Sequence, residues 1–205
     1  MPMKTIAFEG GEGSGKGTII KALAKYLEEK GEKVIITREP GGTEIGEQIR
    51  AIILDSKNSK MTGKTEAMLF AACRSQLLDG FIHPILQENK DGYLLLDRYV
   101  YSSYVYQGVV KAVGIDIVKS INDTATEKWH PDIVFYLDLS PEVGLERIKK
   151  SNRETNRFDK EEMDFHYAVR EGYLKVAKMM NFKIINADQT VEEVLRDVIK
   201  EIENQ

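Results

Sequence analysis

Short apolar runs alternate with longer segments of helical pattern along this chain. The runs are continuous rather than alternating with polar residues, which is typical of parallel strands covered on both faces. We expect strands at residues 5–9, 33–37, 93–97, 133–139 and 183–186. Their alternation with helices predicts an α/β fold of three layers, in which a five-stranded parallel sheet is flanked by helices.

Three of the predicted helices begin at recognisable capping side chains. Ser140 precedes a proline, which suits an N-cap followed by the first helical position. Thr190 and Glu193 have the spacing of a capping box before an apolar stripe. A similar start, with Asp159 and Glu162, predicts a helix that runs to about residue 180.

Residues 8–18 have the layout of a phosphate-binding loop. They follow the first strand and open a helix, and Gly10, Gly15 and Lys16 have the spacing of that motif. Glycines let backbone N–H groups turn toward anionic oxygens, and the helix dipole adds attraction. The motif usually places a hydroxyl residue after the lysine, whereas this chain has Gly17. The residues expected to bind the phosphates of a nucleotide are Gly10, Gly11, Glu12, Gly13, Ser14, Gly15, Lys16, Gly17 and Thr18.

Composition narrows the classes of function. A chain of 205 residues with 42% hydrophobic residues fits one domain over 1–205 with a short lid. A net charge of −4 disfavours a nucleic-acid polymer as partner, because backbone phosphates need a basic face. Apolar runs stay far below the ~20 residues that span a bilayer. We therefore expect a cytoplasmic protein with no membrane partner.

Charged residues follow the carboxyl ends of the predicted strands. Arg38 and Glu39 follow the second strand, and Asp97 and Arg98 lie at the end of the third. Ligands of open α/β sheets bind beyond these ends. The pattern therefore predicts one charged ligand site at this edge, next to the phosphate loop.

A predicted helix over residues 65–87 supplies a second part of the site. Glu66, Phe70 and Arg74 are spaced four residues apart and share a face. A phenylalanine at this spacing is more often a core residue, but beside an arginine it could stack on a base whose edge the guanidinium binds. Further polar residues that could close the pocket are Ser102, Ser103, Tyr106 and Gln107.

These segments resemble thymidylate kinases of the bacterial type. The resemblance rests on the phosphate loop, on Arg-Glu-Pro-Gly-Gly within residues 37–43, on Asp97-Arg-Tyr and on the Tyr-Gln-Gly of residues 106–108. It runs from about residue 4 to 200 and implies a P-loop NTPase fold. It further implies transfer of the γ-phosphoryl group of ATP to dTMP, giving ADP and dTDP for dTTP biosynthesis. Mg²⁺ as cofactor and a homodimer are also implied.

The residues agree with this chemistry. A phosphate acceptor is largely ionised at neutral pH because its second pKa is about 6, so cations matter more than a general base. The histidines lie in no motif and are expected to be structural or surface residues: His83, His130 and His166.

The resemblance also implies roles for individual residues. Phe70 would stack on thymine, Glu12 would meet the sugar 3′-hydroxyl, and Tyr106 would crowd the place of a ribose 2′-hydroxyl. Asp97 would contact Mg²⁺ through water. The dTMP site would contain Glu12, Arg38, Glu39, Arg50, Phe70, Arg74, Arg98, Ser103, Tyr106 and Gln107. The catalytic residues would be Lys16, Asp97, Arg98, Arg153 and Arg157.

Residues 149–158 resemble the lid of the family. The phosphate loop holds no arginine, so Arg153 or Arg157 would deliver the cation that the transferring group needs. An arginine in this role is worth about 10³–10⁵ in rate in GTPases. The alternative is a basic loop that only exposes its charge to water.

Two other functions stay open at this point. The Gly-Lys-Gly-Thr of the phosphate loop is similar to that of adenylate kinases, so another nucleoside-monophosphate kinase, for AMP or a different pyrimidine, is one alternative. A nucleotide-dependent switch module is the other. Residues 89–92 are the nearest approach to the Asn-Lys-x-Asp motif of GTPases, and they lack its final aspartate.

Overall fold

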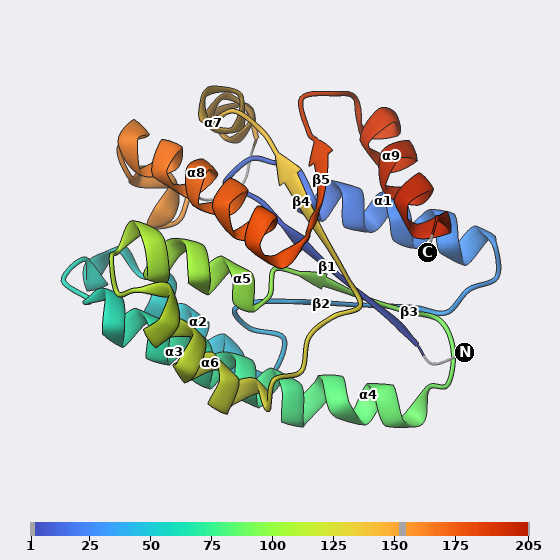
Figure 1. Ribbon diagram of the computed structural model, residues 1–205, viewed down its shortest axis with the longest axis horizontal. Helices are drawn as coiled ribbons and strands as arrows, with labels where there is room; N and C mark the ends of the chain where they lie inside the picture. Colours follow the sequence, from blue (N-terminus) through green and yellow to red (C-terminus); the bar gives the residue numbers. More distant parts are fainter. Residues whose placement is uncertain (1–2, 152–154, 205) are drawn as a thin grey trace.

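The sheet positions everything else in the protein. The computed structural model describes residues 3–151 and 155–204. Within these residues five parallel strands form one sheet in the order β2-β3-β1-β4-β5 (Figure 1). The strands are β1 (Lys4–Glu9), β2 (Val34–Arg38), β3 (Tyr93–Asp97), β4 (Ile133–Asp138) and β5 (Lys183–Asn186). The predicted α/β fold with a five-stranded parallel sheet is confirmed, and strand ends differ by one residue at most.

Alternate residues of each strand face opposite layers of helices. Ile6 and Phe8 of β1 belong to one apolar cluster with α1 (Lys16–Glu29) and α9 (Val191–Glu203). Ala7, between them, belongs to the other cluster. Because successive side chains of a strand point to opposite faces, a continuous apolar run is what a sheet covered on both sides requires. Figure 1 shows α1 and α9 together on one side of the sheet.

The second layer is formed by the longer stretch of chain between β2 and β5. Its cluster includes Leu77, Val105, Val118 and Tyr173, each 1% exposed or less. The α-helices between β2 and β5 are α2 (Glu44–Leu54), α3 (Gly63–Leu77), α4 (His83–Glu88), α5 (Val100–Ser103), α6 (Ile115–Thr126), α7 (Pro141–Lys150) and, within the described residues, α8 (Met163–Met180). Short 3-10 segments lie at Ser56–Asn58 and Phe158–Lys160, and π-helical turns at Leu78–Ile82 and Tyr104–Val110.

The helix predicted over 65–87 is longer and less regular than expected. It is built from α3, the π-helical turn Leu78–Ile82 and α4, so the helical run begins at Gly63 and ends at Glu88. Its N-cap is Thr62, whose side chain accepts a hydrogen bond from the Thr65 N–H.

Two of the three predicted helix starts are confirmed. Ser140 caps α7 before its proline, and Thr190 and Glu193 form the capping box of α9. The start at residue 159 is wrong, because α8 begins at Met163. The Asp159 carboxylate instead accepts a hydrogen bond from the Asn156 N–H at 2.8 Å, on the lid side.

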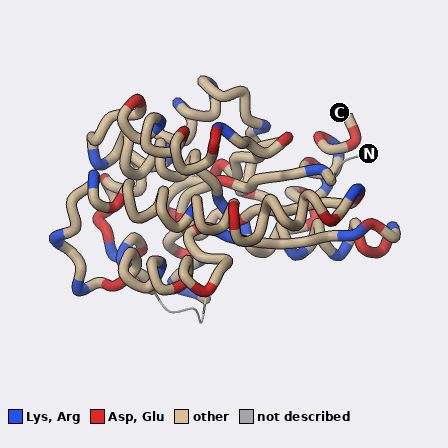
Figure 2. The backbone as a smooth tube through the Cα atoms, turned by 90° about the horizontal axis from the view of Figure 1, so that it is seen from below, with Lys and Arg blue, Asp and Glu red and all other residues tan. Residues whose placement is uncertain are grey.

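The distribution of charge and hydropathy fits a protein with a polar surface. Figure 2 shows Lys and Arg interspersed with Asp and Glu along the elements seen from below. Across residues 3–151 and 155–204, no helix combines the length and the apolar character that crossing a membrane demands.

The phosphate loop is held against the start of α7 by two glycines. Gly13 has a φ of +73°, and a Cβ built there would lie 2.1 Å from the Gly144 carbonyl oxygen. A Cβ on Gly144 would in turn lie 2.4 Å from the Glu12 carbonyl oxygen. The two backbones therefore approach more closely than any side chain would permit.

This close approach predicts that Gly13→Ala destabilises the protein. Overpacking costs about 1–3 kcal/mol, and in a domain of this size each 1 kcal/mol lowers Tm by about 2–4 °C. We expect a loss of several degrees in a thermal melt. Gly11→Ala is the matched control, because a Cβ added to Gly11 would meet no heavy atom within 4 Å and the φ of Gly11 is not positive. A Gly13→Ala protein as stable as the control would contradict the docking of the loop.

Candidate active site

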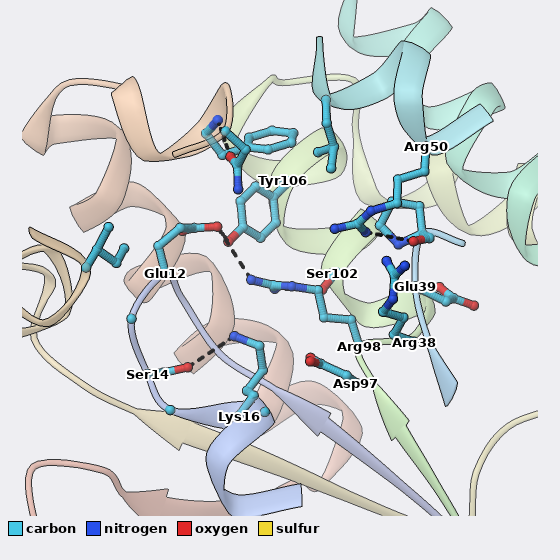
Figure 3. Close-up of a pocket in the computed structure, with 18 of the residues that line it drawn as sticks. Glu12, Ser14, Lys16, Arg38, Glu39, Arg50, Asp97, Arg98, Ser102 and Tyr106 are labelled. Atoms are coloured by element: carbon cyan, nitrogen blue, oxygen red, sulfur yellow. Dashed lines mark hydrogen bonds and ion pairs between the residues drawn. The ribbon is translucent and has the colours of Figure 1, made fainter. Parts of the chain in front are cut away.

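A cavity of about 530 Å³ opens at the carboxyl ends of β1, β2 and β3. Figure 3 shows charged side chains from three strand ends and from α2 pointing into it. Of the predicted residues, its lining contains Glu12, Gly13, Ser14, Gly15, Lys16, Gly17, Thr18, Arg38, Glu39, Arg50, Phe70, Asp97, Arg98, Ser102, Tyr106 and Gln107. The other predicted residues lie outside this lining or outside the described residues, and each is placed below.

Lys16 is folded back onto the phosphate loop at the start of α1. Its Nζ donates hydrogen bonds to the carbonyl oxygens of Gly10 and Gly11, at 2.9 and 3.0 Å, and to Ser14 Oγ at 3.1 Å. Burial, reinforced by the nearby Arg98, lowers the pKa of Lys16 to about 8. Gly10 and Gly11 thus contribute carbonyls to the lysine. The N-terminus of α1 faces the same cavity and favours an anion there.

Position 17 lies opposite the carboxylate of Asp97. A Cβ built on Gly17 would be 3.9 Å from Asp97 Oδ2. No cluster of three or more His, Cys, Asp or Glu side chains that could hold a metal occurs in the part of the chain that the structure describes. One carboxylate beside a phosphate site fits Mg²⁺, which often takes one or two protein carboxylates and completes its shell with phosphate and water.

Arg98 stands at the centre of the site, between the loop and the second strand end. Its φ of +71° is unusual for a residue other than glycine. The guanidinium donates to Ser102 Oγ at 3.1 Å and to the Tyr173 hydroxyl at 2.9 Å. A second nitrogen lies 3.5 Å from Glu12 Oε1. These contacts aim a fixed positive charge into the cavity (Figure 3).

Glu12 is a buried carboxylate surrounded by cationic and hydroxyl groups. Burial by itself would raise its pKa, but His166, Arg98, Lys16 and Tyr106 outweigh burial and lower it to about 2. The Tyr106 hydroxyl donates to Glu12 Oε1 at 2.7 Å, and His166 Nδ1 lies 3.8 Å from Glu12 Oε2. Glu12 is therefore ionised throughout the physiological range of pH.

Two further arginines form the rim on the side of β2. Arg38 pairs with Glu47 at 2.9 Å, and the guanidinium of Arg50 donates to the Pro40 carbonyl at 2.7 Å. Both side chains line the cavity. Each is held by a single strong partner and keeps other N–H groups for an anion.

Phe70 is the residue of α3 that lines the cavity, and Arg74 lies behind the wall. Arg74 is 1% exposed, and its guanidinium is held by the Glu39 carboxylate at 2.8 Å and by the side chain of Asn122. Ser103, also 1% exposed, lies 3.5 Å from the same guanidinium. Here Arg74 positions Glu39, and contact of either Arg74 or Ser103 with a base stays a prediction.

The predicted lid segment, residues 149–158, meets the cavity through described residues on both sides of 152–154, and Ser151 is the one that precedes them. Arg153 lies outside the described residues. Asn156 and Phe158 line the cavity. Arg157 does not line it: its guanidinium is only 8% exposed and pairs with the buried carboxylate of Glu66. The catalytic roles of Arg153 and Arg157 stay predictions.

Comparison with known proteins decides the family. A family model described as Thymidylate kinase matches residues 8–198, nearly the whole chain. This chain belongs to the thymidylate kinase family. A thymidylate kinase of Clostridium novyi (strain NT) is 47% identical over 196 residues, which cover 94% of this chain and 95% of the relative. One of Geobacillus sp. (strain WCH70) is 45% identical over 208 residues, with coverage of 100% and 98%.

Family membership confirms the resemblance inferred from the motifs. Neither alternative, a kinase for another monophosphate or a switch module, is favoured by these relatives.

Reasoning from the sequence gave no role in the site to three residues, Glu9, His166 and Tyr173. Glu9 is fully buried and accepts hydrogen bonds from Ser102 and Tyr173, the two residues that hold Arg98. His166 lies against Glu12. His166 and Tyr173 are seven residues apart on one helix, so their shared face was a signal that could have been found.

The contact between His166 and Glu12 predicts a pH-dependent contribution to stability. Interaction with the carboxylate of Glu12 raises the pKa of His166 above its usual range, despite burial. The charged His166 side chain therefore contributes its full stabilisation at pH values below the pKa of histidine in the unfolded chain, about 6.5. This stabilisation is lost as the pH rises through the higher pKa that His166 has in the folded protein. We expect His166→Asn to lower Tm most near about pH 6 and least above about pH 8.

His130→Asn is a control of opposite sign. Burial lowers the pKa of His130, so its neutral form contributes most above its unfolded pKa and least in acid. The His130 variant should therefore lose more stability at about pH 8 than at about pH 6. If the difference in Tm between wild type and His166→Asn were the same at every pH, the ion pair would contribute nothing to stability.

Proposed function

We propose that this protein transfers the γ-phosphoryl group of ATP to dTMP, giving ADP and dTDP in the synthesis of dTTP. One observation carries the proposal. A single cavity joins the phosphate loop to a second set of cations, Arg38, Arg50 and Arg98, at the neighbouring strand ends. Two phosphorylated molecules can therefore meet tail to tail.

The site suits transfer between two anions. The acceptor phosphate is largely ionised at pH 7, so no residue has to remove a proton. Lys16 and the start of α1 would hold the ATP phosphates, and Arg98 would neutralise charge between donor and acceptor. Lys16 is already surrounded by carbonyl oxygens, and a phosphate would replace these with full negative charge.

Mg²⁺ is the cofactor that the site would hold together with ATP. When bound, Mg²⁺ would supply positive charge that offsets the negative charge of the ATP phosphates. Asp97 would hold it, through water, beside the space that Gly17 leaves open. The loop lacks the usual hydroxyl, so the phosphates and water would supply the remaining oxygens.

The sugar would lie over Glu12 and Tyr106. Glu12 stays ionised and can accept a hydrogen bond from a 3′-hydroxyl, while Phe70 offers its ring to the base. The Tyr106 hydroxyl donates a hydrogen bond to Glu12 at 2.7 Å, which fixes the ring. We propose that this ring would crowd a ribose 2′-hydroxyl.

The activity is tested by ADP release with ATP, Mg²⁺ and a panel of dTMP, dUMP, AMP and CMP. We expect dTMP to be the preferred acceptor and EDTA to abolish turnover. Lys16→Met should lower kcat by at least about 100-fold, because it removes charge from the transferring phosphates. ADP release that no monophosphate accelerates would refute the proposal. A preference for AMP as acceptor would show that the protein is a kinase for a different monophosphate.

We also propose that the protein is a homodimer that associates through α2, α3 and α6. Large apolar side chains are exposed on these three helices, at Ile45, Ile52, Met68 and Ile117. Figure 1 shows the helices side by side on one flank of the molecule, and the contacts of α3 with both neighbours agree. Sedimentation equilibrium should give twice the chain mass of 23.3 kDa. A monomer throughout the micromolar range would contradict the dimer.

A further inference from the structure

Glu66 is a fully buried carboxylate that the proposed reaction does not use. It lies on α3, one turn before Phe70, and three donors from other segments converge on it. Gln107 Nε2 donates to Oε1 at 2.7 Å, Lys111 Nζ donates to Oε2 at 2.8 Å, and Arg157 also donates to Oε2. A buried carboxylate with this many donors has a role beyond filling space, because its desolvation is costly.

The contact with Glu66 decides which way the Gln107 amide points. An ionised carboxylate only accepts hydrogen bonds, so the NH₂ group of Gln107 must face it. The amide oxygen, Oε1, then occupies the opposite corner. It is buried and has no hydrogen-bond partner among the described residues. Leaving such an acceptor unpaired costs about 1–3 kcal/mol, which a ligand donor would recover.

This unpaired acceptor belongs to a side chain that lines the cavity. Gln107 and Phe70 both line it, and they come from different elements, the π-helical turn and α3. A base stacked on the Phe70 ring would lie parallel to it, with the hydrogen-bonding groups of the base edge directed at the side walls of the cavity. The edge of thymine or uracil carries an N3–H donor, whereas cytosine carries a bare N3 acceptor.

We propose that Glu66 is a positioning residue for base selection, which locks the Gln107 amide so that only its oxygen is offered to the base. This inference rests on the proposed function and adds the chemical rule of its selectivity. A base with an N3–H donor satisfies Oε1, and a cytosine would bring two acceptors together. Without the lock, the amide could rotate by half a turn and offer its NH₂ to cytosine.

The two cations on Glu66 support the lock. Lys111 and Arg157 approach the second carboxylate oxygen, which leaves the first for Gln107 alone. Because Arg157 belongs to the predicted lid segment, this end of the lid packs behind the base site. The same carboxylate thus joins the lid to the residue that would select the base.

The test is the selectivity of Glu66→Gln between dTMP and 5-methyl-dCMP. These two acceptors share the methyl group and differ at the base edge. A site built to satisfy a buried hydrogen bond rejects a mismatched analogue strongly, by up to about 10⁴–10⁵. We expect the wild-type ratio of kcat/KM to exceed about 100, and Glu66→Gln to lower it by at least about tenfold, because residue 66 can then also donate.

Three further variants separate positioning from mere structural support. Lys111→Met keeps the Glu66 carboxylate and should leave the ratio within about twofold of wild type. Glu66→Asp keeps an acceptor-only partner and should retain selectivity better than Glu66→Gln. In a Gln107→Ala background, Glu66→Gln should change the ratio no further, because its effect passes through Gln107. A general loss of folded protein would lower the activity with both substrates equally and leave the ratio of their kcat/KM values unchanged.

The outcomes distinguish this inference from the proposed function. Wild-type protein that does not phosphorylate dTMP refutes the function. Intact dTMP turnover with an unchanged ratio in Glu66→Gln overturns the role of Glu66. If circular dichroism shows that Glu66→Gln is unfolded, the wild-type protein decides: similar kcat/KM for dTMP and 5-methyl-dCMP overturns the inference, and strong rejection of 5-methyl-dCMP supports it.

Discussion

The buried carboxylate of Glu9 is the constraint on which the geometry of the site depends. Glu9 is the last residue of the central strand β1. One of its carboxylate oxygens accepts a hydrogen bond from the backbone N–H of Tyr99, the residue after Arg98. The other oxygen accepts from Ser102 at 2.6 Å and from Tyr173 at 2.9 Å. Both of these residues accept hydrogen bonds from Arg98. One carboxylate therefore fixes the backbone turn and the direction of the guanidinium together.

Such a carboxylate must keep its partners. Burial raises the pKa of Glu9, while the charge of Arg98 and the hydrogen bonds act against that rise. Removing one member of a buried charged network typically costs about 3–5 kcal/mol, because the remaining charge is left uncompensated. The unusual φ of Arg98 persists for the same reason, since the surrounding bonds hold it in place. The centre of the site is thus set by the fold before any ligand arrives.

The same principle explains how an acidic protein can present a cationic cavity. The net charge is −4, but Lys16, Arg38 and Arg98, three cations of the cavity, each have an internal oxygen partner. Arg38 has Glu47, Lys16 has loop carbonyls, and Arg98 has Glu12 and two hydroxyls. These partners keep the positive charges in position at a modest energetic cost. A phosphate competes with neutral carbonyls and shared carboxylates, and its full charge gives it the advantage.

Much of this fold was readable from the sequence because the signals are local. Continuous apolar runs indicated the strands, and the cap at Ser140 and the box at Thr190 marked helix starts within one turn. The position of charged residues after strand ends predicted the cavity. The sequence did not show how deeply each residue of the site is buried. Glu66 and Arg74 share a face with Phe70, as the spacing predicts, yet both are buried while Phe70 lines the cavity.

The reason is that the spacing of residues shows which face of a helix each one lies on. It does not show how far that face is from solvent. Whether a charged residue on that face reaches a ligand depends on what stands in front of it, and here Glu39 and Asn122 occupy Arg74. His166 was missed for the related reason that its partner, Glu12, is 154 positions away in sequence. Contacts of that kind form only once the fold brings α8 against the phosphate loop.

Gly17 shows how a departure from a motif can be absorbed by its surroundings. A hydroxyl at this position would stand next to Asp97, since even a Cβ would lie 3.9 Å from the carboxylate. Its absence leaves space for water beside a carboxylate that already faces the phosphate loop. Mg²⁺ gives up its water reluctantly and readily keeps several water molecules as ligands. If Mg²⁺ binds here as we propose, one more water would take the place of the missing protein hydroxyl among its oxygen ligands.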